Sequence, residues 1–220
     1  MGRLRPRADD VTGHDGAFDI VQLPAIVTGF MLNDLADPRP VYIIDALDRI
    51  VFVNPAWSRF MAPACGGGPS LSQVIGRPVW ERIPEGVVRQ LWELLYSRVR
   101  AIGGSVFVPT RADRAEERRL IDIELTRLAD GSIRHVCEPV WSEARPAVAL
   151  LDPAYPRDER SLHCCMWCRR IQVRLGAWEE IEDAQQTLAI PADKTLPRLE
   201  PGACSTCKQS LLKTFPARVA

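Results

Sequence analysis

The chain of 220 residues has no excess of charge of either sign. Lys and Arg together number 28, Asp and Glu also number 28, and the formal net charge is zero. Proteins that bind nucleic acids usually carry a basic face, so this balance argues against a nucleic-acid partner. Only three of the basic residues are Lys, at positions 194, 208 and 213. This strong preference for Arg suggests a GC-rich bacterial source.

Motifs of catalytic sites are missing as well. The chain has three histidines, and it contains no Gly-x-Ser-x-Gly, no kinase ATP motif and no nucleotide-cyclase signature. The glycine run after Cys65 has no following Lys-Ser/Thr, so it is not a phosphate loop. We therefore expect a protein that is not an enzyme.

No apolar run reaches the roughly 18 residues that would cross a membrane. The nearest candidate, 18–32, is broken by Asp19, Gln22, Pro24 and Gly29, and it reads as an amphipathic helix or arm. The first residues do not resemble a signal peptide, and seven cysteines is an odd number for a disulfide framework. We therefore expect no membrane contact and a cytoplasmic location.

Four of the cysteines form two Cys-x-x-Cys pairs near the end of the chain, namely Cys165 with Cys168 and Cys204 with Cys207. Each pair can supply two sulfur ligands to one tetrahedral metal ion. Two pairs complete an all-sulfur shell that leaves no position open for a substrate water. The pattern favours structural Zn²⁺ bound by these four residues. Redox chemistry, an iron–sulfur cluster and coincidence are the alternatives. Cys164, next to Cys165, is expected to be a free thiol.

The sequence divides into five parts. We expect a disordered N-terminus at 1–16, an apolar helix or arm at 17–36, a domain at 37–142, a Pro-rich linker at 143–160 and a small module at 161–220. Apolar side chains of the 17–36 segment include Phe18, Ile20, Val21, Leu23, Ile26, Val27 and Phe30. Such a surface would be a liability if it were exposed, so we expect it to pack against a partner subunit or against the chain's own sheet. Of the two, we favour a homodimer.

Within the first domain the pattern predicts an α+β order. Short apolar runs at 41–44 and 50–53 predict a hairpin, and apolar residues at three- and four-residue steps predict a helix over 87–102. Apolar and polar residues alternate at 121–126, and a further strand-like segment follows at 133–140. Together they predict antiparallel strands. We expect the core to contain Ile43, Val51, Phe52, Leu91, Leu95, Ile121 and Ile123.

The order of elements and several local signatures resemble a PAS domain, a fold of small-ligand and protein-interaction sensors. The resemblance rests on Val41-Tyr-Ile-Ile-Asp45, Val74-Ile-Gly76, Asp130-Gly131 and, above all, Ile50-Val-Phe-Val-Asn54-Pro-Ala-Trp57. It implies a five-stranded antiparallel sheet with flanking helices. Asp48 stands where the family often has glycine, and Asp tolerates the left-handed conformation that the turn needs.

The tail is similar to a cysteine-bearing module that follows sensor domains in bacterial signalling proteins. The matching residues are Cys165-x-Trp167-Cys168, Arg170-Ile171, Trp178, Glu180-Ile181 and Gly202-x-Cys204-x-x-Cys207. The resemblance implies a zinc-knuckle or treble-clef-like module, with helices over 178–188 and 208–215. We expect Trp167 to shield the sulfurs.

His135 and Cys137, two residues apart on the last predicted strand, are the candidates for binding a haem or a metabolite. A hydrogen-bonded or exposed histidine is the plainer interpretation. The leading hypothesis is a sensor or adaptor: the PAS-like domain binds a small ligand or a partner, and the zinc module contacts another protein. A DNA-associated regulator and a thiol-redox switch are the alternatives.

Overall fold

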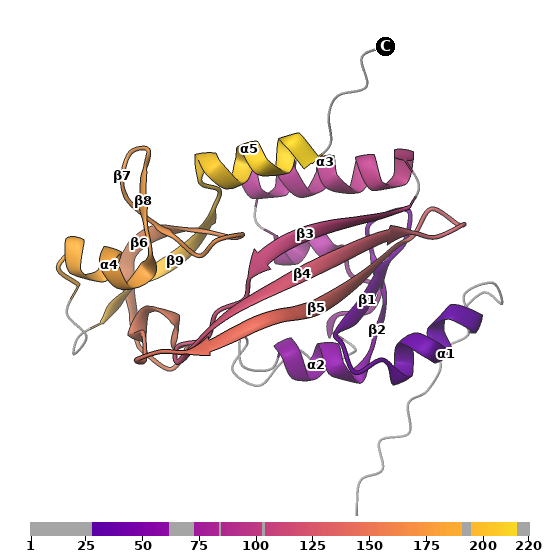
Figure 1. Ribbon diagram of the computed structural model, residues 1–220, viewed down its shortest axis with the longest axis horizontal. Coiled ribbons are helices and arrows are strands. Elements are labelled where there is room, and N and C mark those ends of the chain that lie inside the picture. Colours follow the sequence, from indigo (N-terminus) through magenta and orange to yellow (C-terminus); the bar gives the residue numbers. More distant parts are fainter. Residues whose placement is uncertain (1–27, 62–72, 84, 103, 191–194, 215–220) are drawn as a thin grey trace, which may run out of the picture.

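The computed structural model describes residues 28–61, 73–83, 85–102, 104–190 and 195–214 (Figure 1). The predicted tail at 1–16, the apolar residues at 18–27, the loop with Cys65 and the first residues of a short helix expected near 71–75 lie outside the described residues.

The first domain is a PAS-like antiparallel five-stranded sheet with flanking helices, as expected. The strands lie in the order β2-β1-β5-β4-β3. Their bounds are β1 (Val41–Ile44), β2 (Ile50–Val53), β3 (Ser105–Arg111), β4 (Glu117–Arg127) and β5 (Ile133–Ala144). Two helices connect β2 to β3 and lie against the sheet, α2 (Pro55–Met61) and α3 (Val87–Ile102), with the 3₁₀ turn η3 (Val79–Arg82) between them.

The turn between β1 and β2 confirms the expectation for Asp48, whose φ is +60°. Its carboxylate has further partners, because Arg100 Nη2 donates to Oδ1 at 2.6 Å and Trp80 Nε1 donates to Oδ2 at 3.1 Å. A glycine would satisfy the backbone at this position but would leave both donors without this acceptor. The side chain of Asp48 thus links the first hairpin to α3.

Asn54 explains why the Asn-Pro-Ala-Trp stretch is specific. The side chain is buried, and its Oδ1 accepts hydrogen bonds from the backbone N–H groups of Val41 (3.0 Å) and Trp57 (2.8 Å). The second bond caps the N-terminus of α2. The amide Nδ2 donates to three backbone carbonyl oxygens, those of Asp34, Asp37 and Arg39. One side chain therefore fixes the start of β1, the start of α2 and the segment that precedes the sheet.

Helix α3 buries one stripe against the inner face of the sheet. Its buried residues are Val88, Leu91, Trp92, Leu95, Tyr96 and Val99. The predicted stripe was right except at its end, where Ile102 is 49% exposed. Of the expected core residues, Val51 and Phe52 are only half-buried, since β2 is the edge strand of the sheet.

Helix α1 (Thr28–Ala36) is tied to the sheet by an ion pair. Asp34 is buried, and its carboxylate accepts hydrogen bonds from Nε and Nη2 of Arg134 on β5. Two nitrogens of Arg134 contact both oxygens of Asp34, which strengthens a charge-assisted pair. The pair anchors the last turns of the helix over the sheet.

The C-terminal part forms a second sheet with the strand order β8-β7-β6-β9. The elements are β6 (Arg157–Cys165), β7 (Ile171–Arg174), β8 (Ala177–Glu179), α4 (Ile181–Thr187), β9 (Leu196–Gly202) and α5 (Ser205–Thr214). The helix expected over 178–188 is shorter, because Trp178 belongs to β8 and Glu180 occupies the N-cap of α4. The terminal helix expected over 208–215 begins earlier, at Ser205.

The segment 143–160, read from the sequence as a linker, contains the end of β5, the 3₁₀ turn η4 (Ala149–Leu151) and the first residues of β6. Val148, Ala149 and Leu150 are buried among residues of the second sheet and α4. The proline-rich composition of this segment therefore does not keep it exposed. Within the described residues, no helix has the length and apolar character needed to span a membrane.

The stripe on α3 yields a stability prediction. Leu95→Ala should lower the free energy of unfolding by about 2–5 kcal/mol, since Leu95 is 2% exposed and its removal leaves a cavity. Ile102→Ala on the same helix is the matched control and should cost less than about 1 kcal/mol, because Ile102 is half-exposed. Urea unfolding of both variants measures the difference. Equal losses would show that this stripe does not carry the core.

Candidate metal centre

The four predicted cysteine ligands lie together. The sulfur atoms of Cys165, Cys168, Cys204 and Cys207 are all within 4.8 Å of one another. The Sγ atoms of Cys168 and Cys204 are 3.7 Å apart, too far for a disulfide. Four sulfurs on a tetrahedron with metal–sulfur bonds of about 2.3 Å would be separated by about 3.8 Å. This cluster could hold a metal ion.

The first pair is shaped by the turn between β6 and β7. Cys165 ends β6, and its N–H donates to the carbonyl oxygen of Arg170 at 2.8 Å. The N–H of Arg169 in turn donates to the carbonyl oxygen of Cys165 at 2.9 Å. Arg169 closes the turn with φ +62°, a left-handed conformation that is costly for a side chain this large. The turn presents both sulfurs on one side.

The second pair opens helix α5. Cys204 precedes the helix, and its Sγ accepts from the backbone N–H of Cys207 at 3.4 Å, as a capping side chain does. The N–H of Cys204 donates to Sγ of Cys165 at 3.5 Å. Backbone N–H groups and the positive end of a helix both stabilise negatively charged sulfur. The pair is thus placed where thiolates are favoured.

Parallel pairing of β6 with β9 brings the two cysteine pairs together. In this register Cys165 lies opposite Gly202, two residues before Cys204. The approach is close, since a Cβ at position 202 would lie 3.1 Å from the ring of Trp178 and 3.4 Å from the Cβ of His163, so a larger residue would push these neighbours aside by a few tenths of an ångström. The gap of residues between the pairs is filled by β7, β8, α4 and β9.

Charge within the cluster also favours a cation. Hydrogen bonds from the thiols of Cys168 and Cys207 lower the pKa of Cys165, and the interaction with Cys165 raises the pKa of Cys168 to about 12. Ionising one sulfur therefore opposes ionisation of its neighbour. A bound divalent cation would remove this opposition, since metal ligation requires deprotonated sulfur.

Two neighbouring donors stay outside the cluster. Cys164 is buried, and its Sγ lies 3.7 Å from the carbonyl oxygen of Arg169. Burial raises the pKa of this thiol. The side chain of His163 is 56% exposed and lies 3.9 Å from Glu200. The structure thus brings together the two pairs and leaves the adjacent His-Cys dipeptide apart.

Trp167, inside the first pair, connects the cluster to the PAS-like domain. Its carbonyl oxygen accepts a hydrogen bond from the backbone N–H of Arg111, at the end of β3, at 2.7 Å. Its ring stacks on Trp92 of α3, with centroids 6.1 Å apart and an interplanar angle of 27°. Leu211 of α5 belongs to the same buried cluster as these rings, and Figure 1 shows α5 beside α3. Trp167, which we expected to shield the sulfurs, thus also forms a joint between the two sheets.

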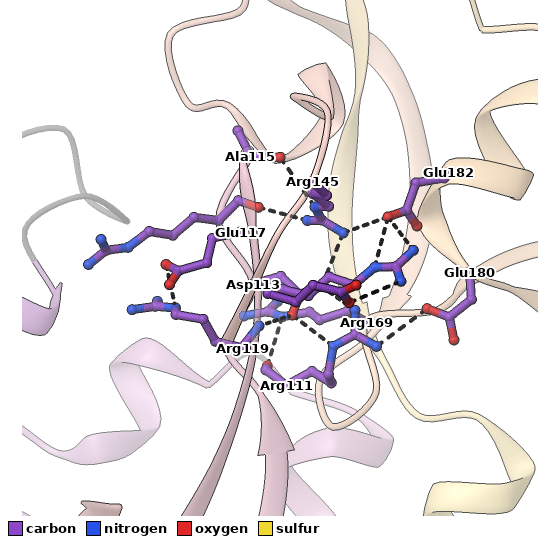
Figure 2. A network of polar contacts seen from close by, with 12 residues as sticks. Arg111, Asp113, Ala115, Glu117, Arg119, Arg145, Arg169, Glu180 and Glu182 are labelled. Atoms are coloured by element: carbon purple, nitrogen blue, oxygen red, sulfur yellow. Dashed lines mark hydrogen bonds and ion pairs between the residues drawn. The ribbon is translucent and has the colours of Figure 1, made fainter. Parts of the chain in front are cut away.

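A polar network continues this joint, as Figure 2 shows. The carboxylate of Asp113, which has no exposed surface, pairs with Arg111 and lies 3.4 Å from Nη1 of Arg145. Arg145 Nη1 also donates to Oε1 of Glu182, on α4, at 2.9 Å. Arg118 donates to the same oxygen at 2.9 Å. The hairpin between β3 and β4 is thereby bonded to the second sheet's helix. This network was not identified from the sequence, because its partners come from elements far apart in the chain.

His135, a candidate for cofactor binding, lies at the centre of the first domain. It is fully buried, stacks on Tyr42 at a centroid distance of 4.0 Å and lies edge-on to Tyr96. Both ring nitrogens have partners, Nδ1 at 3.2 Å from the carbonyl oxygen of Ile133 and Nε2 at 3.2 Å from the hydroxyl of Tyr96. A haem iron or ligand at this position would have to displace one of these contacts.

Cys137 is buried two residues further along β5, and burial raises the pKa of its thiol to about 12. It lines a cavity of about 370 Å³ together with Phe60, Ile121 and Trp141. His135 is not among the lining residues of that cavity. The two candidates therefore face different surroundings.

Solved structures match about half of the chain. No family model and no curated protein matches the chain. The PAS domain of Bordetella pertussis BvgS matches 52% of this chain and 86% of its own, at 19% identity and a TM-score of 0.41. A domain of a sensory box sensor histidine kinase/response regulator from Geobacter sulfurreducens matches 51% of this chain and 93% of its own, at 17% identity and a TM-score of 0.35. A sensory box sensor histidine kinase from Vibrio cholerae matches 52% of this chain and 90% of its own, at 14% identity and a TM-score of 0.34.

The ligand set yields the second prediction. Cys168→Ser should abolish metal binding, because serine replaces a sulfur ligand with a poor donor for a soft site. Cys164→Ser is the matched control and should retain one metal ion per chain, since its sulfur lies outside the cluster. Elemental analysis of both purified proteins measures the metal content. Loss of metal in Cys164→Ser with retention in Cys168→Ser would assign the ligands differently.

A third prediction follows from the burial of His135. Burial lowers its pKa to about 3, against about 6.5 in an unfolded chain, so below pH 6.5 the unfolded state binds the extra proton. Stability contributed by neutral His135 is present above the unfolded pKa and declines as pH falls towards the folded pKa. From pH 7.5 to 5.5 this loss amounts to about 1.4 kcal/mol.

Urea unfolding at the two pH values tests this expectation. His135→Gln removes the titrating ring, so the variant should lose about 1.4 kcal/mol less than the parent protein over the same interval. The difference between the two changes in unfolding free energy is free of the contribution from carboxylates, because both proteins contain the same carboxylates. Equal pH dependence in the two proteins would mean that His135 does not carry the effect.

Proposed function

We propose that the chain is a non-enzymatic, cytoplasmic sensor or adaptor of bacterial signal transduction. Its PAS-like domain responds to a small ligand or a partner, and its cysteine module passes that state on by protein contact. The sensor role comes from fold analogy, since the PAS-like architecture is one that sensors use. The relay role comes from the geometry of this chain.

The joint at Trp167 carries the proposal. Its carbonyl oxygen accepts from Arg111 on β3 and its ring packs on Trp92 of α3, so one residue between two cysteine ligands touches both layers of the PAS-like domain. A shift of α3 against the sheet changes both contacts at once. The cysteine module can therefore respond to a change in the first domain without a flexible connection. Such a response is a population shift between two ways of packing the cysteine module against the PAS-like domain.

Zinc is the ion we assign to the cluster. An all-cysteine set of four suits Zn²⁺, and four protein ligands leave no position for a reacting water. The ion's role in this proposal is to fix the turn that holds Trp167. Oxygen-preferring ions such as Mg²⁺ and Ca²⁺ do not suit sulfur donors.

The partner in this proposal is a protein, and a second copy of the chain is one form that it takes. Leu32 and Leu35 on α1 are 65% and 40% exposed, and they follow the apolar sequence at 18–27 that lies outside the described residues. Apolar side chains gathered on one segment favour contact with another surface. α1 is thus the surface that we assign to dimer formation.

Removal of zinc from the full chain tests the relay. We expect one Zn²⁺ per chain, and chelation should increase amide hydrogen exchange at the end of β3, at residues 110 and 111, where the N–H of Arg111 depends on the cysteine turn. The internal control is the β1–β2 hairpin, whose bonds do not involve that turn. Its exchange should change less than about twofold.

Two results would contradict the proposal in different ways. A metal content without zinc would overturn the identity of the ion and leave the relay open to the same exchange measurement. Unchanged exchange at residues 110 and 111 after complete loss of the metal would show that the module does not communicate with β3, and would overturn the relay.

A further inference from the structure

A cleft of about 780 Å³ lies where the two sheets meet. Its walls come from the end of α2, the hairpin between β3 and β4, the turn η4, the cysteine turn and β9. Clefts of a few hundred cubic ångströms between packed units are common places for small-molecule sites. Nothing in the metal centre or in the PAS-like core uses this space.

Five arginines line the cleft, against two aspartates. The arginines are Arg114, Arg119, Arg157, Arg169 and Arg198. Of the aspartates, Asp113 has no exposed surface and is already paired with Arg111 and Arg145, while Asp152 accepts from the N–H of Ala154 at 2.9 Å. The cationic side chains therefore outnumber the anionic ones that can face a ligand.

Most of these guanidinium groups contact carbonyl oxygens. Arg157 donates to the carbonyl oxygens of Leu150 (3.1 Å), Asp152 (2.7 Å) and Pro197 (3.2 Å). Arg169 donates through Nε to the carbonyl oxygen of Arg111 at 3.1 Å. Within the described part of the chain, neither side chain forms an ion pair with a carboxylate within 4 Å. Both guanidinium groups are thus held in place by carbonyl oxygens, which carry no full negative charge.

Arg119 shows that the charges crowd one another. It donates to the carbonyl oxygen of Ala112 at 2.8 Å, and its nearest carboxylate, that of Glu117, is 3.6 Å away. Burial lowers the pKa of Arg119, repulsion from Arg114 and Arg169 lowers it further, and attraction to Glu117 and Asp113 offsets part of the effect. Figure 2 shows Arg119 and Arg169 on the hairpin and the cysteine turn. Like charges converging on one cleft are stabilised by an anion between them.

The remaining walls are apolar. They are formed by Phe60, Met61, Leu150, Leu151, Met166 and Leu199. The guanidinium of Arg119 lies 5.2 Å from the ring centroid of Phe60, so the charged and apolar walls meet at that point. A nucleic acid would be expected to need aromatic faces along an open basic groove. In this cleft the arginine cluster meets one aromatic ring, that of Phe60, and the other large apolar side chains of the lining are aliphatic.

We propose that the cleft binds a small amphipathic molecule with one anionic head group, a carboxylate or a phosphate, and an apolar body. The head group lies among the arginines, where planar guanidinium groups match both anions. The body lies against the methionine and leucine side chains. The inference adds a ligand site outside the PAS-like core and does not depend on which ion the cysteines bind.

Isothermal titration of the full-length protein with decanoate and with decyl phosphate tests the site. Each probe is expected to bind with a stoichiometry of one, and 1-decanol, of the same length without charge, at least about tenfold more weakly. The two anionic probes distinguish a carboxylate from a phosphate source. Acetate and inorganic phosphate should bind at least about tenfold more weakly than the matching long-chain probe, since they lack the apolar body.

The decisive variant is Arg114→Gln with Arg198→Gln. Both side chains are exposed, so the fold should be retained, and the affinity for both anionic probes should fall at least about tenfold. The matched control is Arg127→Gln with Arg174→Gln, which removes two exposed arginines that do not line the cleft. The control should bind within about twofold of the parent protein. Equal urea midpoints for the three proteins exclude a folding effect.

Three results would overturn the inference. One is binding of 1-decanol as tightly as decanoate, and another is equal affinity in the decisive and control variants. The third is tighter binding of a ten-nucleotide RNA that is lost in the decisive variant, which would assign the arginines to a nucleic-acid surface. Each of these leaves the zinc content and the exchange at β3 unaffected, so failure here is distinguishable from failure of the proposed relay.

Discussion

The buried carboxylate of Asp113 determines how the two halves of this molecule fit together. It has no exposed surface, and it is neutralised by Arg111 on its own hairpin and by Arg145 beyond β5. Removing such a charge from water costs several kcal/mol unless cations and hydrogen bonds surround it. Arg145 is itself held by Glu182 on α4. The hairpin, the end of β5 and the second sheet's helix therefore have to assemble in one arrangement, and the cleft and the cysteine turn take their positions from it.

Local features of the first domain could be predicted because single residues decide them. Asp48 adopts the left-handed turn, and Leu91 and Leu95 face the sheet because helical spacing leaves no other face for them. Asn54 was recognisable as part of a motif, although its bonds to five backbone groups were visible only in the fold. Val51 and Phe52 were wrong as core residues because a strand pattern does not reveal which strand lies at the edge.

Features that depend on distant pairing were not predictable. The proximity of Cys165 and Cys204 was expected from their spacing, but the parallel register between β6 and β9 that produces it was not, because the proline-rich sequence before Cys204 gives no strand signal. The four candidate ligands were identified from the spacing of the cysteines along the chain. The contacts of Trp167 depend on where α3 packs, which the spacing does not reveal. His135 likewise could have been a ligand or a packed side chain. Its stacking on Tyr42 and its bond to Tyr96 depend on three separate elements meeting.

The turn between Cys165 and Cys168 connects the metal centre, the PAS-like domain and the arginine cleft. Trp167 contacts β3 and α3, while Met166 and Arg169 line the cleft. Arg169 holds a left-handed conformation that a free chain would rarely adopt. A metal ion bound by both cysteines would hold this strained turn in one shape. Because the same few residues face three neighbours, a ligand in the cleft and a shift of α3 would each act on the geometry of one turn, which is the physical requirement for coupling between separate sites.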